Sequence, residues 1–296
     1  MKKFLLAYNP VSGDAMFKKK LDDIIRRFQE KNCIIMPYRT IKEEYDPFFF
    51  KSVRDVHADG VIAAGGDGTL HKIINMILRE NLEVPVGIIP SGTSNDFASY
   101  LGIDVQFDEY IESITEGKTR AIDVGYVDKT DTYFINVVSA GMMTSVAHEV
   151  DTRLKNNFGK MAYYFRGIGE LPRFRGLDFS IEADGEIIEA KSFFVLIFNS
   201  PVVASFKNIA PEAKIDDGKL DMILLRQCNI PELMKVVADT VSGKFSIDNK
   251  NVIYKQASCF KLNCPDPVES DLDGELGPML PFEVRTVKHA LEMFVP

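Results

Sequence analysis

The sequence predicts an open, mostly parallel α/β sheet domain followed by a β-sandwich domain with helical insertions. Two observations support this prediction. Residues 1–125 alternate short apolar segments with segments of helical periodicity, which is typical of a parallel sheet with helices on both faces. Residues 126–296 contain many strand-like segments and few helical ones, which is typical of a sandwich or barrel. The expected domains are therefore residues 1–125 and residues 126–296.

In the first domain, strands are expected at short apolar runs and helices where apolar residues recur every three or four positions. Phe17, Leu21, Ile24 and Phe28 show this helical spacing. The expected strands span residues 4–8, 33–38, 61–64 and 84–89, and the expected helices span residues 15–31, 46–56, 70–80, 93–101 and 107–115.

In the second domain, turn dipeptides such as Asp184-Gly185 and Asp217-Gly218 separate strand-like runs. The expected strands span residues 122–127, 133–138, 179–183, 186–190, 193–199, 220–225, 251–256 and 260–263. Helical insertions are expected at about residues 142–170 and 231–240.

The composition is that of a globular protein, with 46% hydrophobic and 26% charged residues. A net charge of −8 argues against a nucleic-acid partner, because such proteins need a basic face. No segment approaches the apolar length of a membrane-spanning helix. The four cysteines form no C-x-x-C pair, so reduced thiols and a cytoplasmic location are expected.

The segment Gly65-Gly66-Asp67-Gly68-Thr69 lies between an expected strand and an expected helix. A glycine-rich turn in that place presents backbone N–H groups and a helix N-terminus to an anion. A carboxylate inside the turn would repel phosphate unless a divalent cation lay between them. The motif therefore predicts nucleotide phosphates with Mg²⁺, although a bare tight turn remains an alternative.

Three further motifs follow expected strand ends or the domain boundary: Asn9-Pro10-Val11-Ser12-Gly13, the segment 90–98, and Ile122-Asp123-Val124-Gly125. Each has a simpler interpretation as an ordinary turn, a helix cap or a solvated turn residue. Ligands of open α/β sheets bind at the carboxyl ends of the strands. We therefore expect Asp67, Asp96 and Asp123 to face one cleft, where Mg²⁺ held partly through water would offset their charge.

The second domain contains two acidic turns, at residues 213–221 and 270–275. The first is rich in oxygen donors and is equally well explained as a cation-stabilised turn or as a plain Asp-Gly hairpin. In the second, an Asp-Gly turn competes with the hypothesis that Glu275 or Asp273 acts as a general base.

Six motifs in order carry a family resemblance over essentially the whole chain. They are Asn9-Pro10-x-Ser12-Gly13, Gly65-Gly66-Asp67-Gly68-Thr69, Ser91-Gly92-Thr93-x-Asn95-Asp96-Phe97-Ala98, Asp123-x-Gly125, Asp217-Gly218-x-Leu220-Asp221 and Asp273-Gly274-Glu275. The chain resembles the soluble bacterial diacylglycerol-kinase-like lipid kinases, relatives of sphingosine and ceramide kinases.

The resemblance implies an ATP-binding N-terminal domain and a lipid-binding C-terminal domain, with Glu275 as the base that accepts the lipid hydroxyl proton and Asp67, Asp96 and Asp123 organising Mg²⁺ through water. It also implies a structural Mg²⁺ held by the Asp217 carboxylate and the carbonyls of Lys214 and Lys219. The implied nucleotide contacts are Asn9, Pro10, Val11, Ser12, Gly13, Thr40, Gly66, Asp67, Gly68, Thr69 and Thr93.

The predicted activity is ATP-dependent phosphorylation of a lipid hydroxyl, with diacylglycerol as the first candidate acceptor. The expected partners are a membrane-derived lipid and, transiently, the inner membrane surface, and a homodimer is compatible with the sequence. The family often has Asn-Glu where this chain has His71-Lys72, and we expect Lys72 to be a solvated helix residue. The alternatives are an NAD-kinase-like enzyme and a non-catalytic lipid-binding protein on a kinase fold.

Overall fold

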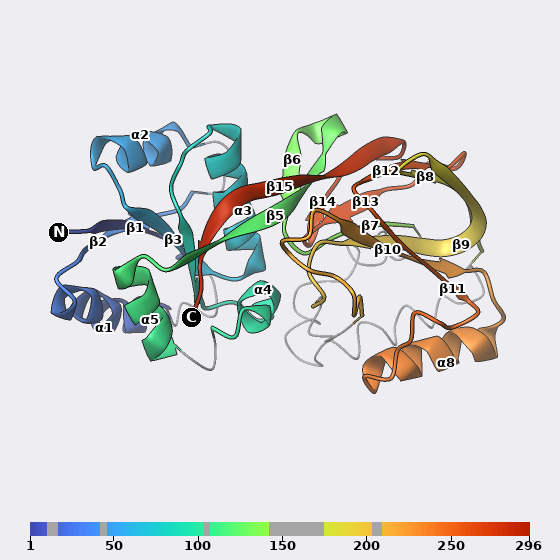
Figure 1. Ribbon diagram of the computed structural model, residues 1–296, viewed down its shortest axis with the longest axis horizontal. Coiled ribbons are helices and arrows are strands. Elements are labelled where there is room, and N and C mark those ends of the chain that lie inside the picture. The colour runs from blue at the N-terminus through green and yellow to red at the C-terminus, as the bar shows by residue number, and fades with distance from the viewer. Residues whose placement is uncertain (11–16, 42–45, 104–106, 142–174, 203–208) are drawn as a thin grey trace. The chain divides into compact units, whose positions relative to one another are not determined.

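The computed structural model describes residues 1–296 except 11–16, 42–45, 104–106, 142–174 and 203–208 (Figure 1). The chain forms two compact units, one of Met1–Val124 with Val287–Pro296 and one of Gly125–Thr286. The last ten residues therefore belong to the first unit, whereas the sequence had assigned them to the second domain. Strand β15, Phe282–Phe294, carries the chain back.

The first unit is built on a parallel sheet. Its strands are β1 (Lys3–Tyr8), β2 (Ile34–Arg39), β3 (Gly60–Gly65) and β4 (Val86–Pro90), in the order β4-β3-β1-β2. The pairs β1–β2, β1–β3 and β3–β4 are all parallel, and the end of β15 joins β4 in the same sense through Met293 and Val86. Strand β3 is buried along its whole length, as expected for a strand covered on both faces.

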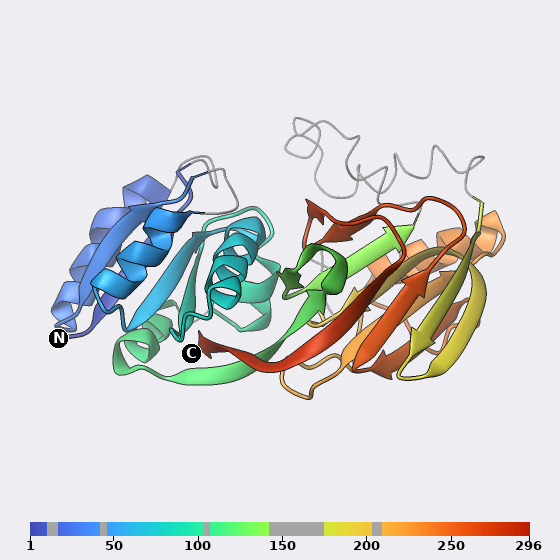
Figure 2. The same cartoon turned by 90° about the horizontal axis from the view of Figure 1, so that it is seen from above.

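Helices cover both faces of this sheet. They are α1 (Phe17–Glu30), α2 (Pro47–Asp55), α3 (Asp67–Arg79), α4 (Asp96–Tyr100) and α5 (Phe107–Glu116). Helix α2 lies on one side of β1 and β2, and α1 with α5 lies on the other (Figure 1), while Figure 2 shows α2 and α3 side by side on their face. The predicted α/β architecture of this unit is confirmed.

Two helix starts differ from the prediction. Helix α3 begins at Asp67 rather than at Leu70, so the acid of the glycine turn lies in the first helical turn. Helix α4 begins at Asp96 rather than at residue 93, because Asn95 adopts a left-handed conformation with φ 50° that a helix cannot contain.

The second unit is predominantly antiparallel, with strand order β14-β13-β7-β9-β8-β12-β15, and β10 pairs with β9 and β11. Strand β5 enters this unit from the first, and β6 pairs with it. Among the described residues, this unit has the α-helix α8, Ile230–Val241, which begins with an Asn229–Glu232 capping box, and a short 3-10 helix at Asp128–Thr130. The remaining strands are β5 (Thr119–Val127), β6 (Thr132–Phe134), β7 (Val137–Gly141), β8 (Leu177–Ala183), β9 (Glu186–Phe198), β10 (Leu220–Arg226), β11 (Val252–Ala257), β12 (Cys259–Asn263), β13 (Ser270–Leu272) and β14 (Glu275–Leu276).

The β-sandwich class is confirmed, and the strand limits are corrected. Glu186–Phe198 forms the single strand β9, where two strands are expected at 186–190 and 193–199, and the strand expected at 133–138 is divided between β6 and β7. Strands β13, β14 and β15 were not predicted. The helical insertion expected at residues 142–170 lies outside the described residues.

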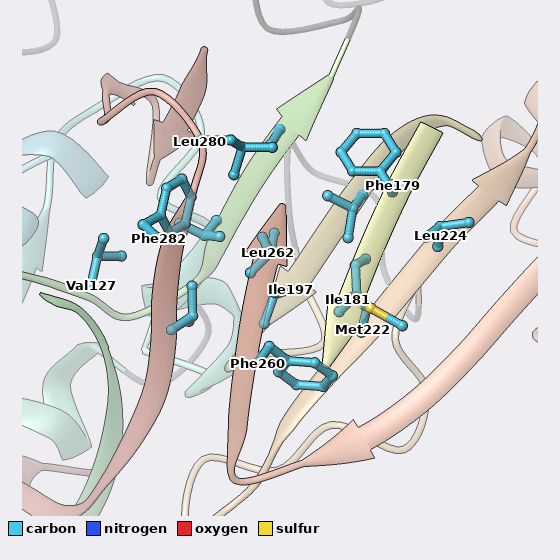
Figure 3. Packing of buried hydrophobic residues seen from close by; sticks show 14 of the residues in the cluster. Val127, Phe179, Ile181, Ile197, Met222, Leu224, Phe260, Leu262, Leu280 and Phe282 are labelled. Carbon is cyan, nitrogen blue, oxygen red and sulfur yellow. The ribbon is translucent and has the colours of Figure 1, made fainter. Parts of the chain in front are cut away.

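Two hydrophobic clusters hold the second unit together, one on each face of β10. Met222 and Leu224 point into the larger cluster, which Figure 3 shows with Phe179, Ile181, Ile197 and Phe260. Ile223 and Leu225 point the other way and pack with Leu233 and Val236 of α8. The alternation follows from the two-residue period of a strand, and it explains why β10 is a continuous apolar run. No helix among the described residues is long and apolar enough to cross a membrane.

Candidate active site

The carboxyl ends of β1, β3 and β4 meet at one edge of the parallel sheet. The backbone N–H of Asn9 donates to the Ala64 carbonyl at 3.1 Å, and the N–H of Ser91 donates to the Gly65 carbonyl at 2.9 Å. The Asn9 side-chain amide lies 3.5 Å from the Thr69 hydroxyl. Three of the predicted motifs are therefore brought together by direct hydrogen bonds.

The glycines of this edge allow backbone to approach backbone. A Cβ atom on Gly92 would lie 2.4 Å from the Gly66 Cα atom, and one on Gly65 would lie 2.2 Å from the Thr69 hydroxyl oxygen. Neither position has room for a side chain, so glycine is required by packing rather than by an unusual φ.

Helix α3 starts inside this crowded turn, with Gly66 as its N-cap. Glycine has no side chain to accept the first helical N–H groups, so these donors can bind an anion instead. A small pocket at this point is lined by Gly65, Gly66, Asp67, Leu70, Ile88, Asn95 and Ala98. The geometry is that of a phosphate-binding turn.

The Asp67 carboxylate links α3 to α4. Its two oxygens accept the backbone N–H groups of Asp96 at 3.1 Å and of Phe97 at 3.2 Å. Asp67 therefore caps the start of α4 from another element.

Asn95 is a residue whose role the sequence did not reveal. Its side-chain oxygen accepts the Gly92 N–H and its side-chain amide donates to the Gly92 carbonyl, both at 2.9 Å. Together with its left-handed backbone, these bonds fix the loop that presses against Gly66. The sequence feature that could have indicated this role is an asparagine in a glycine-containing loop, because asparagine tolerates the left-handed backbone conformation.

The other two predicted acids are buried. Asp96 is 8% exposed, and Asp123 of β5 is wholly buried, with one carboxylate oxygen accepting the backbone N–H of His289 at 2.8 Å. Within the described ranges, no three His, Cys, Asp or Glu side chains are grouped closely enough to hold a metal ion directly. Asp67 and Asp96 are joined by the hydrogen bond from the Asp96 N–H to the Asp67 carboxylate, and Asp123 is tied to β15 through His289.

The remaining predicted nucleotide residues lie along the same edge or outside the described ranges. Thr40 is buried at the end of β2, and its N–H and hydroxyl both donate to the Tyr8 carbonyl, at 3.0 and 3.2 Å. Gly68 and Thr93 are exposed and Thr69 is buried. Pro10 lies two residues after the end of β1, and Val11, Ser12 and Gly13 lie outside the described residues.

His71 and Lys72 occupy different environments on α3. His71 is buried, and its carbonyl accepts the side-chain amide of Asn75 at 2.9 Å. The Lys72 ammonium donates to the Ile41 carbonyl, next to Thr40. Lys72 thus contacts the loop after β2 through an exposed hydrogen bond, and its expected character as a solvated helix residue stays a prediction.

In the second unit, Asp273 has a structural role. Its carboxylate accepts the backbone N–H groups of Ile135 at 2.8 Å, Asn136 at 2.9 Å and Val137 at 3.0 Å, where the chain breaks between β6 and β7. Glu275, two residues later on β14, is exposed. Between the two candidate bases, Asp273 is committed to the backbone and Glu275 is accessible.

The turn before β10 keeps both of its earlier interpretations. The Asp217 carboxylate accepts the Lys219 N–H at 3.0 Å, and Lys214 and Lys219 are exposed. Asp221 is fully buried and accepts hydrogen bonds from the Tyr254 hydroxyl and, at 3.0 Å, from the Gln256 amide. Burial raises the pKa of the Asp221 carboxyl, and the nearby Asp217 and Glu212 raise it further.

Two family models match successive parts of the chain. Residues 3–127 match the diacylglycerol kinase catalytic domain, and residues 136–295 match the YegS C-terminal NAD kinase beta sandwich-like domain. These matches, with the phosphate-binding turn, define a two-domain kinase.

Full-length relatives specify the family. The chain is 31% identical to a diacylglycerol kinase of Bacillus subtilis (strain 168), covering 100% of this chain and 97% of the relative. It is 32% identical to a diacylglycerol kinase of Staphylococcus aureus (strain JH9), covering 100% and 93%. The crystal structure of a diacylglycerol kinase from Bacillus anthracis str. Sterne has the same fold, with a TM-score of 0.81, 22% identity and coverage of 100% and 97%.

The chain therefore belongs to the diacylglycerol kinase family. Membership makes it a lipid kinase that uses ATP, as the sequence motifs predicted.

Proposed function

We propose that this protein transfers the γ-phosphoryl group of ATP to the hydroxyl of diacylglycerol and so produces phosphatidic acid. The observation that carries the proposal is the match of the whole chain, both units included, to relatives named diacylglycerol kinase. The phosphate-binding turn on α3 supplies independent physical support.

The nucleotide site of this proposal lies at the carboxyl edge of β1, β3 and β4. The uncapped N–H groups of α3 would bind phosphate oxygens, and the close contact of Gly66 with Gly92 would let backbone reach them. Asn9, Thr40, Thr69 and Thr93 would add polar contacts, as would residues 10–13. Lys72, anchored beside Thr40, would place a positive charge near this edge.

Asp67, Asp96 and Asp123 would organise Mg²⁺ through water. The fit is chemical, because Mg²⁺ prefers hard oxygen ligands and usually keeps several of its waters. When bound, Mg²⁺ would neutralise charge on the phosphates. The protein's own contribution is to hold the carboxylates in place, Asp67 by the N–H groups of α4 and Asp123 by the N–H of His289. A second Mg²⁺ is proposed at Asp217 with the carbonyls of Lys214 and Lys219, again a hard-oxygen donor set.

Glu275 would act as the general base. Its carboxylate would take the proton of the lipid hydroxyl while that oxygen bonds to the γ-phosphorus, and the bond from phosphorus to the β–γ bridging oxygen breaks so that ADP leaves with the electron pair. Asp273 is not assigned this role, because three backbone N–H groups already occupy its oxygens.

The lipid acceptor requires access to a membrane, so transient contact with the inner membrane surface is part of the proposal. Leu276 and Met279, 66% and 45% exposed, follow Glu275 closely in the chain and would offer apolar side chains to that surface. A homodimer is compatible with membrane contact through this hairpin.

An acceptor panel tests the proposal. Purified protein is given radiolabelled ATP with dispersed diacylglycerol, with NAD, or with an extracted lipid mixture, and the labelled product is identified. Labelled phosphatidic acid is the expected result. Labelled NADP would indicate an NAD kinase, and tight ATP binding without transfer to any acceptor would indicate a non-catalytic lipid-binding protein.

A further inference from the structure

Asp123 is held by a residue outside every motif that the sequence singled out. The N–H of His289, in β15, donates to a carboxylate oxygen of Asp123 at 2.8 Å. Both residues belong to the first unit, because β15 returns the chain to it from Val287 onward. We propose that His289 is a positioning residue for the kinase reaction, acting on Asp123 through its backbone.

The backbone of His289 is unusual at this point. Its φ is 49°, in the left-handed region that L-residues other than glycine seldom adopt. Its side chain is exposed. The left-handed backbone therefore occurs at the same residue whose N–H donates to Asp123, while the imidazole side chain lies on the surface.

His289 lies between two stretches of β15 that pair with other strands. Before it, Phe282–Arg285 pair with β12, and the Thr286 N–H donates to the Ser258 carbonyl at 2.8 Å. After it, Met293 pairs with Val86 of β4. His289 lies between these two pairings, so the strand is anchored on both sides of the left-handed residue.

A fully buried carboxylate needs such a partner. Asp123 has no exposed surface, so bulk water cannot satisfy or reorient it. A backbone N–H held in a strand fixes the carboxylate more rigidly than a side-chain donor would, because the strand has no rotamers to lose. This inference rests on the proposed function, in which Asp123 serves the bound nucleotide and its ion.

The chain offers a matched control for the test. His57 is also an exposed histidine of the first unit, and its φ is 50°. It follows α2, and its N–H donates to the Arg54 carbonyl rather than to an acid. Valine disfavours a left-handed backbone, whereas glycine accepts it, so both positions can be changed in the same way.

The expected results separate positioning from stability. His289→Val lowers kcat about 10-fold or more with a smaller change in KM, since small displacements of a reacting group are costly. His289→Gly rescues kcat, because it keeps the conformation and the N–H. His57→Val lowers the melting temperature to a similar extent but leaves kcat unchanged. In nucleotide-free protein, hydrogen exchange at the His289 amide is slow in the wild type and in Asp123→Asn, and faster in Asp123→Ala.

Other results overturn the inference. A folded His289→Val protein with wild-type kcat would remove the positioning role, while wild-type lipid kinase activity would still support the proposed function. An equal loss of kcat in His57→Val would reduce the effect to general destabilisation. A wild type that phosphorylates no lipid would instead overturn the proposed function, and the positioning role with it.

Discussion

Two acidic turns of this molecule look alike in sequence and differ in structure. Asp67 follows Gly66 in the first unit, and Asp273 precedes Gly274 in the second. Both carboxylates accept backbone N–H groups from distant segments: Asp67 accepts two from the start of α4, and Asp273 accepts three from the break between β6 and β7.

The difference lies in what surrounds each carboxylate. Asp67 stands at the carboxyl edge of a parallel sheet, beside a helix start whose N–H groups can bind phosphate. Asp273 has a left-handed backbone in an antiparallel hairpin and ties that hairpin to the chain near Asn136, and the accessible acid is Glu275. The role of an acidic residue next to a glycine therefore depends on its hydrogen-bond partners and on where it lies in the sheet, which the sequence motif alone does not reveal.

The largest expected effect comes from removing the Asp67 carboxylate. Asp67→Ala should abolish turnover, a loss of at least about 10³-fold, because it removes both the cap of α4 and the charge that we propose organises Mg²⁺ at the phosphates. Phosphatidic acid formation measures the loss, and circular dichroism checks the fold. Wild-type turnover in a folded Asp67→Ala protein would contradict the mechanism.

The hairpin should respond mainly in stability. Asp273→Ala leaves three backbone N–H groups without their acceptor, at about 1–3 kcal/mol for each donor that water cannot reach. Urea unfolding should show a loss of about 3 kcal/mol. Glu275→Gln is the matched comparison and should unfold like the wild type, since Glu275 is exposed. Equal stability of Asp273→Ala and Glu275→Gln would contradict the structural role assigned to the Asp273 carboxylate.

Gly92 tests the packing of the glycine edge. Gly92→Ala places a Cβ atom 2.4 Å from the Gly66 Cα atom, so the phosphate-binding turn must shift. We expect ATP affinity to fall roughly 10-fold, as measured by calorimetry. The control is Gly185→Ala, where the new Cβ meets nothing but φ is 91°, so it should cost about 1 kcal/mol of stability and no ATP affinity. Unchanged ATP binding by Gly92→Ala would show that the turn is not pressed against the nucleotide.

Asp221 should give the smallest effect, and one that depends on pH. Burial raises its pKa, so the folded protein keeps the proton to a higher pH than the unfolded chain does. Stability from this group is therefore present at low pH and is lost as the pH rises through the folded pKa. Asp221→Asn should gain stability relative to the wild type as the pH rises above about 4, the ordinary pKa of an aspartate, and the gain should reach about 1 kcal/mol once the wild-type carboxyl is ionised. A gain that grows toward low pH would have the wrong sign.

The fold class and most elements of the first unit could be predicted, because strand and helix periodicities are local. The start of α3 could not, since Asp67-Gly68-Thr69 has turn chemistry and becomes helical only against the packed glycine edge. Strand β15 escaped prediction because its middle, from Arg285 to His289, is largely polar and contains a left-handed residue.

Candidate site residues with a chemically functional side chain could be predicted from the sequence more easily than residues that position another residue. Asp67 and Glu275 stand in motifs with recognisable chemistry. The hydrogen bond from His289 to Asp123 joins residues 166 positions apart in the sequence. The hydrogen bonds that Ile135 and Val137 donate to Asp273 span a similar sequence separation. No local sequence pattern indicates contacts of this kind. The two hydrogen bonds between the Asn95 side chain and the Gly92 backbone are local in sequence, but an asparagine at this position is equally well explained as a helix cap.

Glu275 provides the most direct test of the central claim that the chain is a diacylglycerol kinase whose second-unit hairpin supplies the base. Wild type and Glu275→Gln are compared for labelled phosphatidic acid formed from diacylglycerol in mixed micelles, with ATP affinity measured alongside. The wild type should form labelled phosphatidic acid, and the variant should lose about 10²–10⁴-fold in kcat with its ATP affinity unchanged. Equal rates for the two proteins would contradict it.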